Sequence, residues 1–473
     1  MRSNRRNFLR ISGMAGIGLA GGAGILDANA GVHHESQSGE ARLQKGGAKR
    51  FNMSGYAAPK IETVRIGFVG LGSRGPGHVT RMSKIEGVEI KALCDIRPDH
   101  AEKVKKSLEN TNHRPDLYTA GENDWKRMCE RKDIDLIFIA TPWDLHTPMA
   151  VYAMEQGKHA VTEVPAAVTL DECWQLVETS EKTRRHCMIL ENCCYDFFEL
   201  LTLNMARQGF FGEIVHTEGA YIHHLLESNF DKDGYYDMWR LKENKRNGNL
   251  YPTHGLGPVS QIMNLNRGDR MDYLVSTSSD DFMMGDTAKA LASKDDFFKP
   301  YANWKFRGNM NTTSIRTVKG KTIMLQHDVT SPRVYSRIHL VSGTKATARK
   351  YPEPETPRIA TSHEGWLTQE EMKVLEEKYA PPIVTRVGEL AKQIGGHGGM
   401  DFLLDWRLID CLRNGIPLDI DVYDAALWSA ISPLSEASVA NRSKTMDVPD
   451  FTGGNWKTNA PVDVTLAKGG NTK

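Results

Sequence analysis

The chain has 473 residues, and its 60 lysines and arginines nearly balance its 59 aspartates and glutamates. A net charge this close to zero argues against a nucleic-acid partner and against an anionic membrane. The length is sufficient for two domains. The seven cysteines are an odd number with no CxxC pair and no zinc spacing, which for an exported protein argues against a disulfide framework.

The first 30 residues have the parts of an export signal. Arg5 and Arg6 precede a Gly-rich apolar run, and Ala28-Asn29-Ala30 follows in the A-x-A form of a cleavage site. The alternative is a basic tail before a buried apolar segment. We predict a twin-arginine signal over 1–30 and a linker over 31–60. The protein is then exported to the periplasm, and it has no membrane anchor because no apolar run is long enough to span a bilayer.

Strands and helices alternate through residues 61–192. Such alternation predicts a parallel sheet with helices on both faces, the Rossmann form of the α/β class. The expected strands are 63–70, 88–96, 135–142, 159–165 and 187–192, and the expected helices are 76–85, 98–110, 146–157 and 169–185. The last helix opens with Thr169 and has Glu172 three residues later, which is a capping box.

Residues 193–450 have a different pattern, and 451–473 form a C-terminal tail. A helix at 196–209 is followed by segments of period-two character at 213–224, 273–279, 313–329 and 335–349. Lys319-Gly320 and Ser342-Gly343 mark turns within the last two segments. Two helices follow at 400–415 and 421–443, the first ending at Gly415. We predict a C-terminal α+β domain with a largely antiparallel open sheet.

A dinucleotide site is predicted at the end of the first strand. Gly70, Gly72 and Gly75 form G-x-G-x-x-G between a strand and a helix, the context in which the pattern binds pyrophosphate. Asp95 ends the next strand, where an acid binds the ribose 2′-hydroxyl of NAD. Arg97 is near enough to accept a 2′-phosphate, so NADP remains open.

These features together resemble the glucose-fructose oxidoreductase/inositol dehydrogenase/MocA superfamily. In that superfamily the fifth strand usually ends in Glu-Lys-Pro, and this chain has Glu163-Val164-Pro165. The lysine helps polarise a hydroxyl during simple hydride transfer. Its absence argues against an ordinary dehydrogenase.

A narrower resemblance covers nearly the whole chain after the linker, from about residue 64 to 451. The stretches 140–165, 187–196, 251–259 and 395–425 resemble glycoside hydrolase family 109, whose members are NAD-dependent α-N-acetylgalactosaminidases. The resemblance implies a substrate with a terminal N-acetylgalactosamine, and a mechanism unlike that of two-carboxylate glycosidases. NAD⁺ oxidises C3, a base removes the C2 proton, and the C1 group is eliminated. Water then adds, C2 is reprotonated, and hydride returns to C3. The result is hydrolysis with retention and no net use of cofactor.

The resemblance and the glycine motif together assign the site residues. The cofactor-binding residues are Gly70, Gly72, Ser73, Arg74, Gly75, Asp95, Trp143, Asp144, Leu145, His146, Glu163, Val164 and Asn192. The substrate-binding residues are Tyr221, Arg240, Tyr251, Pro252, Thr253, His254 and Tyr335. The cofactor set lies at or just beyond the carboxyl ends of the predicted parallel strands, where ligands bind in open α/β sheets.

Several of these residues have a plain structural alternative. His146 also suits the start of a helix, Tyr221 suits one face of a strand, and Arg240 suits a surface arginine packed on Trp239. Glu163 follows an apolar strand, where an acid seldom serves packing alone.

His254 is the first candidate for proton transfer, because it lies in "YPTHGLG", predicted to be a loop, and imidazole exchanges protons near neutral pH. Tyr195 is the second candidate. His397 in "GGHGG" is interpreted as an exposed loop residue. His223 and His224 point to opposite faces of a strand, and we predict no metal site.

Two other functions remain open at this point. One is a periplasmic sugar oxidoreductase with tightly bound NAD(P), and the other is a silent sugar-binding module. In the superfamily the open antiparallel sheet often forms homodimers, so a homodimer is one expected arrangement. Export of a folded protein with its cofactor favours a reaction that regenerates that cofactor in each cycle.

Overall fold

The structure is a computed structural model that describes residues 50–351 and 357–473. The predicted signal at 1–30 and the predicted linker up to residue 49 lie outside the described residues. Within the described ranges no helix combines the length and apolar character needed to cross a bilayer.

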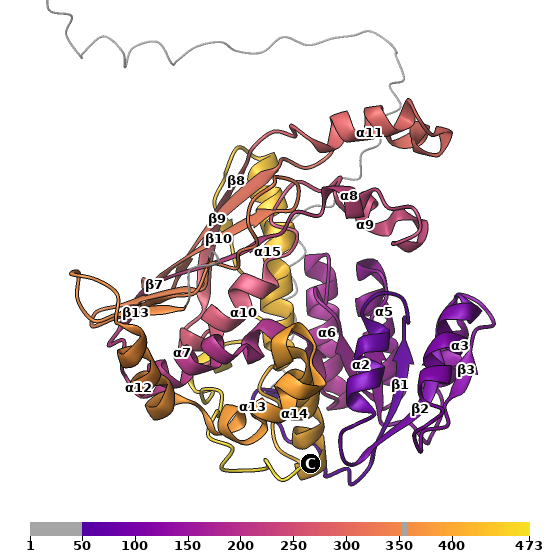
Figure 1. Ribbon diagram of the computed structural model, residues 1–473, viewed down its shortest axis with the longest axis horizontal. Coiled ribbons are helices and arrows are strands. Elements are labelled where there is room, and N and C mark those ends of the chain that lie inside the picture. Colours follow the sequence, from indigo (N-terminus) through magenta and orange to yellow (C-terminus); the bar gives the residue numbers. More distant parts are fainter. Residues whose placement is uncertain (1–49, 352–356) are drawn as a thin grey trace, which may run out of the picture. The chain divides into compact units, whose positions relative to one another are not determined.

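The first domain is a six-stranded parallel sheet with the strand order β3-β2-β1-β4-β5-β6, and Figure 1 shows it with its helices. The strands are β1 (Val64–Val69), β2 (Val88–Cys94), β3 (Asp116–Tyr118), β4 (Leu136–Ile139), β5 (His159–Thr162) and β6 (Cys187–Ile189). The helices are α2 (Gly75–Met82), α3 (Pro98–Ser107), α4 (Asp124–Cys129), α5 (His146–Glu155) and α6 (Leu170–Thr183). Every residue of β4 and β5 is buried, as expected for strands covered on both faces.

The predicted Rossmann arrangement is confirmed, including the Thr169–Glu172 capping box of α6. The short elements β3 and α4 were not predicted. A strand of three residues has too few positions to display a period, so its place is determined by pairing with β2.

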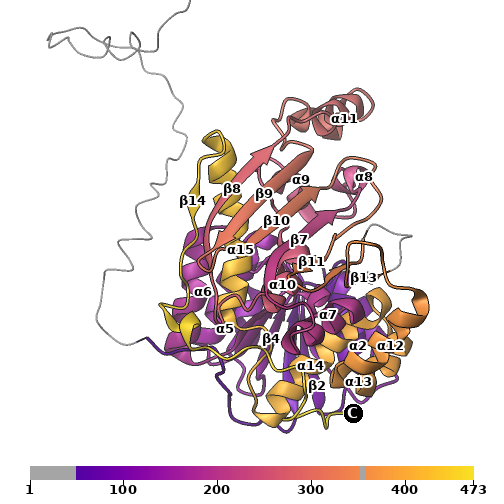
Figure 2. The ribbon, with the colours of Figure 1, turned by 90° about the vertical axis from the view of Figure 1, so that its left-hand side faces the viewer.

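The second domain contains an eight-stranded sheet with the order β13-β12-β11-β7-β10-β9-β8-β14. Figure 2 shows its strands side by side. They are β7 (Ile214–Ile222), β8 (Met271–Ser278), β9 (Met310–Thr317), β10 (Thr322–Asp328), β11 (Leu340–Gly343), β12 (Thr347–Arg349), β13 (Arg358–Ala360) and β14 (Met446–Asp447). Among the strand pairs formed by the described residues of this sheet, only β7–β10 is parallel, so the predicted largely antiparallel sheet is confirmed. The turn after β11 lies at Thr344 and Lys345, two residues later than the predicted Ser342-Gly343.

The second domain contains helices of 4 to 19 residues. They are α7 (Phe197–Arg207), α8 (Leu226–Asn229), α9 (Trp239–Glu243), α10 (Thr253–Ile262), α11 (Met284–Ala292), α12 (Gln369–Tyr379), α13 (Pro382–Ile394), α14 (Met400–Asn414) and α15 (Val422–Ala440). The end of α14 at Gly415, with φ of 61°, is as predicted.

The predicted loop at residues 251–257 is wrong, because α10 begins at Thr253. Helix α10 lies directly against β7. A Cβ on Gly219 of β7 would lie 2.5 Å from the carbonyl oxygen of Gly255, and one on Gly255 would lie 2.3 Å from the nitrogen of Ala220. The pair of glycines therefore permits a helix start where the composition indicates a loop.

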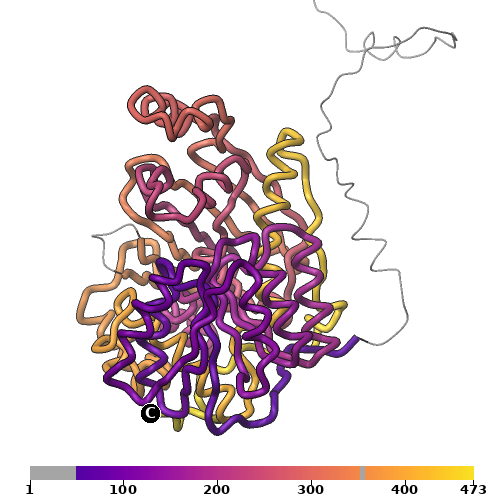
Figure 3. Tube along the Cα trace, turned by 90° about the vertical axis from the view of Figure 1, so that its right-hand side faces the viewer, coloured from indigo at the N-terminus to yellow at the C-terminus, as the bar shows by residue number. Residues whose placement is uncertain are grey.

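The chain after the second sheet returns to the first domain. Helix α14 packs against α2, and α15 packs against α6 as well as against β8. The carbonyl of Thr472 accepts a hydrogen bond from the indole of Trp406, and the backbone nitrogen of Lys473 donates to Glu86. Figure 3 shows the C-terminus beside indigo segments of the first domain. The predicted tail is thus packed onto both domains.

Candidate active site

A cavity of about 1090 Å³ lies where the carboxyl ends of the first sheet meet the second domain. Its walls come from the loops after β1, β2, β4 and β5, from the end of β7, and from α9 and α10. Most of the predicted site residues line it: Gly70, Gly72, Ser73, Arg74, Asp95, Trp143, Asp144, Leu145, His146, Glu163, Val164, Asn192, Tyr221, Arg240, Tyr251 and His254. Residues up to 184 positions apart, from Gly70 to His254, are thereby brought to one site.

A few predicted residues lie outside this lining. Pro252 and Thr253 are buried at the start of α10, where they hold His254. Tyr335 lies behind the wall, with its ring centroid 5.1 Å from that of His223. Gly75 faces the protein interior.

Tyr195 does not line the cavity, contrary to the prediction. Its hydroxyl donates to Asp419 Oδ2 at 3.3 Å, and its side chain is buried away from the cavity. Burial raises the pKa of this phenol well above its usual range, and the Asp419 carboxylate raises it further. We therefore withdraw Tyr195 as a candidate for proton transfer.

The glycine loop has the form that a dinucleotide needs. Gly70 has φ of 87°, and a Cβ there would lie 2.5 Å from the carbonyl oxygen of Ala140. A Cβ on Gly75 would lie 2.0 Å from the carbonyl oxygen of Gly70, so this glycine permits α2 to approach the strand. At Gly72 a Cβ would meet nothing within 4 Å and would enter the cavity. This open position is where the pyrophosphate approaches the backbone in such folds.

Asp95 is fixed at the end of β2 in a position suited to a ribose. Its Oδ2 accepts from the backbone nitrogen of Leu71 at 2.6 Å, and Oδ1 accepts from that of Arg97 at 2.8 Å. The Arg97 guanidinium lies on the surface, 3.3 Å from Asp99. An anchored carboxylate at this position suits a ribose hydroxyl, and Arg97 also lines the cavity.

His254 is paired with a buried carboxylate that the sequence analysis missed. Its Nδ1 lies 2.8 Å from Oε1 of Glu191, which follows β6 and is fully buried. Burial would raise the pKa of Glu191, but the charge and hydrogen bond of His254 outweigh it and hold that pKa below its usual value. Among the described residues only Nδ1 of the His254 ring has a hydrogen-bond partner, which leaves Nε2 for a ligand.

The substrate side of the cavity is an aromatic wall built by both domains. The Arg240 guanidinium lies over the rings of Trp143, Tyr235, Trp239 and Tyr251, with distances of 5.5–6.0 Å to their centroids. Flat aromatic surfaces beside a guanidinium suit a sugar ring.

Tyr221 connects this wall to the histidine. Its ring centroid is 4.4 Å from that of Tyr251 and 5.4 Å from that of His254, and its hydroxyl lies 2.9 Å from Nδ1 of His223. Of the alternatives for Tyr221 and Arg240, the structure favours the cavity over a plain sheet face or surface.

The buried ring of His146 lies between two loops of the first domain. Its Nδ1 lies 2.7 Å from the carbonyl of Pro165 and its Nε2 lies 2.8 Å from that of Thr141. Burial lowers the pKa of this imidazole. Since both nitrogens face backbone carbonyls, the ring links the loops after β4 and β5.

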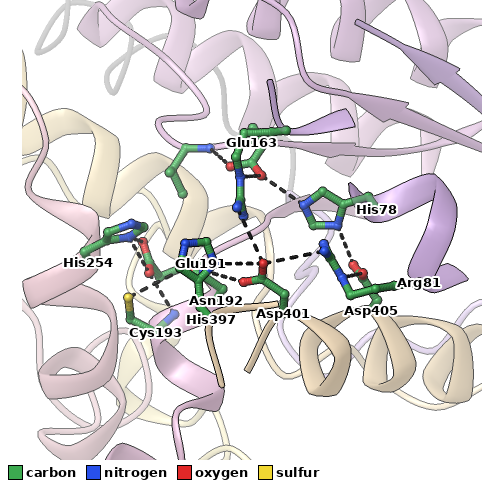
Figure 4. Close-up of polar contacts among 12 residues, drawn as sticks. His78, Arg81, Glu163, Glu191, Asn192, Cys193, His254, His397, Asp401 and Asp405 are labelled. Carbon is green, nitrogen blue, oxygen red and sulfur yellow. Dashed lines mark hydrogen bonds and ion pairs between the residues drawn. The ribbon is translucent and has the colours of Figure 1, made fainter. Parts of the chain in front are cut away.

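A chain of charged side chains, most of them buried, runs from the glycine loop into the second domain (Figure 4). Arg74 Nε donates to Glu163 Oε1 at 2.8 Å, and Nε2 of His78 lies 3.0 Å from the same oxygen. Nδ1 of His78 lies 2.7 Å from Asp405, on α14. Burial would raise the pKa of Glu163, but the Arg74 charge and the His78 hydrogen bond hold it far below its usual range. Glu163 thus connects the loop after β5 to α2 and, through His78, to α14.

Asp401 is the second acid that α14 supplies to this network. It accepts hydrogen bonds from Asn192 Nδ2 at 2.6 Å and from His397 Nδ1 at 2.9 Å. The guanidinium groups of Arg74 and Arg81 lie 3.5 and 3.6 Å from it. His397 is therefore more than an exposed loop residue, because it is held by a buried acid and lines the cavity.

Glu191, Cys193 and His254 bring three metal-ligand atoms within 4.8 Å of one another. The thiol of Cys193 also lies 3.0 Å from Nη1 of Arg337. A fixed guanidinium at that distance disfavours a second cation, and burial raises the pKa of the thiol well above its usual value. The cluster does not fit a metal ion.

Two family models match the chain, one on each side of residues 191–194. The NAD-binding Rossmann fold of an oxidoreductase family matches residues 64–190, and the C-terminal domain of glycosyl hydrolase 109 matches residues 195–458. The second match covers more than half of the chain.

The chain belongs to glycosyl hydrolase family 109.

The relatives of this family 109 enzyme agree with that assignment. An α-N-acetylgalactosaminidase of Bacteroides fragilis is 53% identical over 85% of this chain and 95% of its own length. A family 109 protein of Shewanella pealeana is 45% identical over 98% of this chain and 99% of its own length.

Solved structures share the fold at low identity. Levoglucosan dehydrogenase in complex with NADH and levoglucosan matches with a TM-score of 0.62 at 17% identity, over 82% of this chain and all of that one. The scyllo-inositol dehydrogenase of Lactobacillus casei with bound NAD(H) matches with a TM-score of 0.57 at 15% identity, over 82% of this chain and 99% of that one. The cradle at Gly72 and the Rossmann family model together support a nicotinamide cofactor.

Proposed function

We propose that this family 109 enzyme hydrolyses terminal α-N-acetylgalactosaminides with retention, using bound NAD. A relative at 53% identity carries the name of that activity. The observation on which the proposal depends is a shared cavity, in which an open glycine cradle and the His254–Glu191 pair face the same space. Such a cavity suits a reaction that needs a dinucleotide and a proton-transfer group at one sugar.

The cofactor is held by the glycine loop, by Asp95 and by the loops after β4 and β5. When bound, NAD⁺ supplies the reversible oxidation of the C3 hydroxyl that makes the C2 proton acidic. Val164 occupies the position at which related oxidoreductases carry lysine, and its side chain is buried. The ammonium is absent from this wall, so proton handling depends on the histidine side.

His254 moves the proton on the sugar. Glu191 accepts the hydrogen bond from Nδ1–H, which fixes the ring orientation and leaves the lone pair on Nε2 to take a proton. The edges of Tyr221 and Tyr251 confine the ring. The ring is therefore ready to act at C2 or at the C3 hydroxyl of a sugar lying on the aromatic wall.

Arg240 orients the sugar. Its guanidinium is fixed by the aromatic rings around it and has donors in a planar fork that fits the oxygen of an acetamido group. The wall thus selects a neutral sugar that carries an acceptor beside C2.

The test is turnover of 4-nitrophenyl α-N-acetylgalactosaminide by purified enzyme in D₂O. We expect release of nitrophenol, deuterium at C2 of the sugar, and the α-anomer as first product. The matching α-galactoside, which lacks the acetamido group, should react more slowly. Mass analysis of the denatured protein should identify NAD. Release without deuterium contradicts the elimination route, and a lasting change in cofactor redox state with sugar alone favours the oxidoreductase alternative.

We further propose that the enzyme is exported in folded form by the twin-arginine route. The support is the order of arginines, apolar run and A-x-A site in residues 1–30. A cofactor bound before export and regenerated in each cycle needs no external supply. Replacing Arg5 and Arg6 by lysines should keep the activity inside the cell, and unchanged export of that variant contradicts the proposal.

A further inference from the structure

A group of cavity-lining residues from one segment has no role in the proposed function. Its members are Leu225, Asp233, Gly234, Tyr236, Asp237 and Lys242. All of them belong to residues 225–243, the segment that contains α8 and α9 and also carries Arg240. The group therefore continues the cavity beyond the place where Arg240 and the aromatic wall receive the terminal sugar.

Two consecutive tyrosines in this segment have different surroundings. The ring of Tyr235 belongs to the cluster around Arg240, with its centroid 5.5 Å from the guanidinium and 5.5 Å from the ring centroid of Trp239. Tyr236 is 54% exposed, and within the described part of the chain its side chain has no aromatic, cationic or hydrogen-bonding partner. Since Tyr236 also lines the cavity, its ring is available to a ligand that extends past the Arg240 cluster.

A small apolar core holds the segment in place. It joins residues 225–243 to residues 279–309, the connection between β8 and β9, and the two segments form a lobe beside the cavity. The buried residues of this core are Phe230, Met238, Leu241, Met284, Ala288, Phe298 and Phe306. Helices α8, α9 and α11 of the lobe lie close together in Figure 1 and in Figure 2. This core is separate from the main hydrophobic core, so the lobe is an addition to the two sheets and not a part of either.

The backbone next to Tyr236 is strained. Asp237 and Met238 have φ values of 51° and 53°, in the left-handed region that is unfavourable for residues other than glycine. This turn places Met238 in the apolar core of the lobe, where it is 2% exposed, while Tyr236 remains at the cavity. An ion pair between Asp237 and Lys242 closes the turn. Strain of this kind persists only where the surrounding structure requires it, and it is frequent at binding sites.

We propose that Tyr236, with Asp233 and Lys242 beside it, forms a subsite for the aglycone, and that this aglycone is a second sugar. The assignment rests on the proposed function, because it concerns the group to which the N-acetylgalactosamine is attached. The terminal sugar lies among Arg240 and its aromatic rings. The attached group must leave that enclosed part of the cavity on the solvent side, which is where the exposed ring of Tyr236 lies.

The chemistry of the lobe surface fits a pyranose. One face of such a ring carries C–H groups that pack on a flat tyrosine, and its edge carries hydroxyl groups. Asp233 and Lys242 are exposed at the cavity and offer a carboxylate that accepts hydrogen bonds and an ammonium that donates them. A tyrosine has only two side-chain torsions to fix, so it provides contact area at a low cost in conformational entropy.

The test compares aglycones in the variant Tyr236→Ala. The substrates are N-acetylgalactosamine α-linked to O3 of galactose, α-linked to serine, and as its methyl α-glycoside. We expect kcat/KM for the disaccharide to fall about tenfold, mainly through KM, as for the loss of one aromatic contact. The methyl glycoside is too small to reach Tyr236, so its kcat/KM should be nearly unchanged. The serine glycoside should lose less than the disaccharide.

Two further variants are the controls. Tyr236→Phe keeps the flat ring and should retain the wild-type preference for the disaccharide. Phe282→Ala removes an aromatic side chain that is 71% exposed on the same lobe but outside the cavity lining, and it should leave all three substrates unaffected. Circular dichroism of each variant checks that the lobe and the rest of the protein remain folded.

The remaining outcomes overturn the proposal at different points. Equal losses on the disaccharide and the methyl glycoside, or no loss on either, overturn the subsite while the proposed function stands. A loss on the serine glycoside at least as large as that on the disaccharide overturns the second sugar and indicates a peptide aglycone. Absence of hydrolysis of all three substrates by the wild-type enzyme overturns the proposed function, and the subsite with it.

Discussion

The two walls of the cavity bind by different means. The nucleotide wall consists of strand ends and a glycine loop, and its main contribution is backbone that a ligand can approach closely, as at Gly72. The opposite wall consists of large side chains, with Arg240 among aromatic rings and His254 on a buried acid. On the nucleotide wall the glycines leave backbone exposed to a ligand, whereas on the opposite wall large side chains make the contacts.

This difference separates what the superfamily shares from what the family adds. A backbone cradle recognises a dinucleotide in many enzymes, so it carries no information about the reaction. In the proposed mechanism it is the side-chain wall that acts on the sugar. Variants that add a side chain to the glycine loop, or change a side chain of the opposite wall, test this difference most directly.

The largest effect is expected from His254→Ala. Loss of the imidazole should lower kcat by about 10³-fold, within the usual 10²–10⁴ range for acid–base catalysis, and should abolish deuterium exchange at C2. Tyr195→Phe is the control, because that hydroxyl faces Asp419 and should leave kcat nearly unchanged. A large loss of activity in the control would show that the cavity wall extends to Tyr195.

The second-largest effect is expected from Asp401, whose ion pairs connect the two domains. Asp401→Asn leaves Arg74, Arg81 and His397 without their shared anion, and should lower the free energy of unfolding at pH 7 by about 3 kcal/mol. The folded pKa of Asp401 lies below the unfolded value of about 3.9, so its contribution is present above that pH and is lost as pH falls toward the folded pKa.

Urea unfolding at a series of pH values checks this sign. The stability difference between wild type and Asp401→Asn should be constant from pH 7 to 5 and should narrow below pH 4. A difference that widens as the pH falls would mean that Asp401 is protonated in the folded protein.

A smaller effect is expected at the nucleotide wall. Gly72→Val adds a side chain to open space, so the fold should persist while the affinity for NAD falls at least about tenfold, which is about 1.4 kcal/mol. Gly75→Ala gives the contrast, because its Cβ would lie 2.0 Å from backbone and should disturb folding itself. Cofactor titration and circular dichroism separate the two results. Unchanged affinity in Gly72→Val would place the pyrophosphate elsewhere.

The smallest effect is expected from Arg240→Lys. The charge remains, but the planar group that lies over the rings is lost. The loss should weaken the free energy of substrate binding by about 1 kcal/mol. KM for the N-acetylgalactosaminide should rise about fivefold with little change in kcat. An equal change in KM for the α-galactoside would mean that Arg240 does not contact the acetamido group.

The sequence predicts the nucleotide wall better than the opposite wall, for a physical reason. A strand, three glycines and a helix start form a local pattern, and their mutual geometry follows from chain connectivity. The His254–Glu191 and His78–Asp405 pairs join residues 63 and 327 positions apart, for which no local pattern exists. The start of α10 at Thr253 was missed because its glycines suit a loop until β7 is placed beside them.

One signal for the buried charges was present. Helix α14 carries Asp401 and Asp405 one turn apart, and both are buried. Acids at that spacing on a buried helix face require cationic or hydrogen-bonding partners. The sequence thus indicated that α14 meets buried cations or donors, although it did not identify Arg74, Arg81 and His78.

The chain of charges from Glu163 through His78 to Asp405 has a consequence for how such proteins can be recombined. The two acids of α14 belong to the second domain by sequence, yet Arg74, Arg81 and His78, which they contact, lie on the nucleotide half. A chimera that joins this Rossmann segment to a foreign second half would leave the buried Arg81 without a counter-ion, and would leave Arg74 and His78 paired with Glu163 alone. The nucleotide half and α14 therefore form one structural unit. Domain exchanges between relatives should give folded proteins only when both are transferred together.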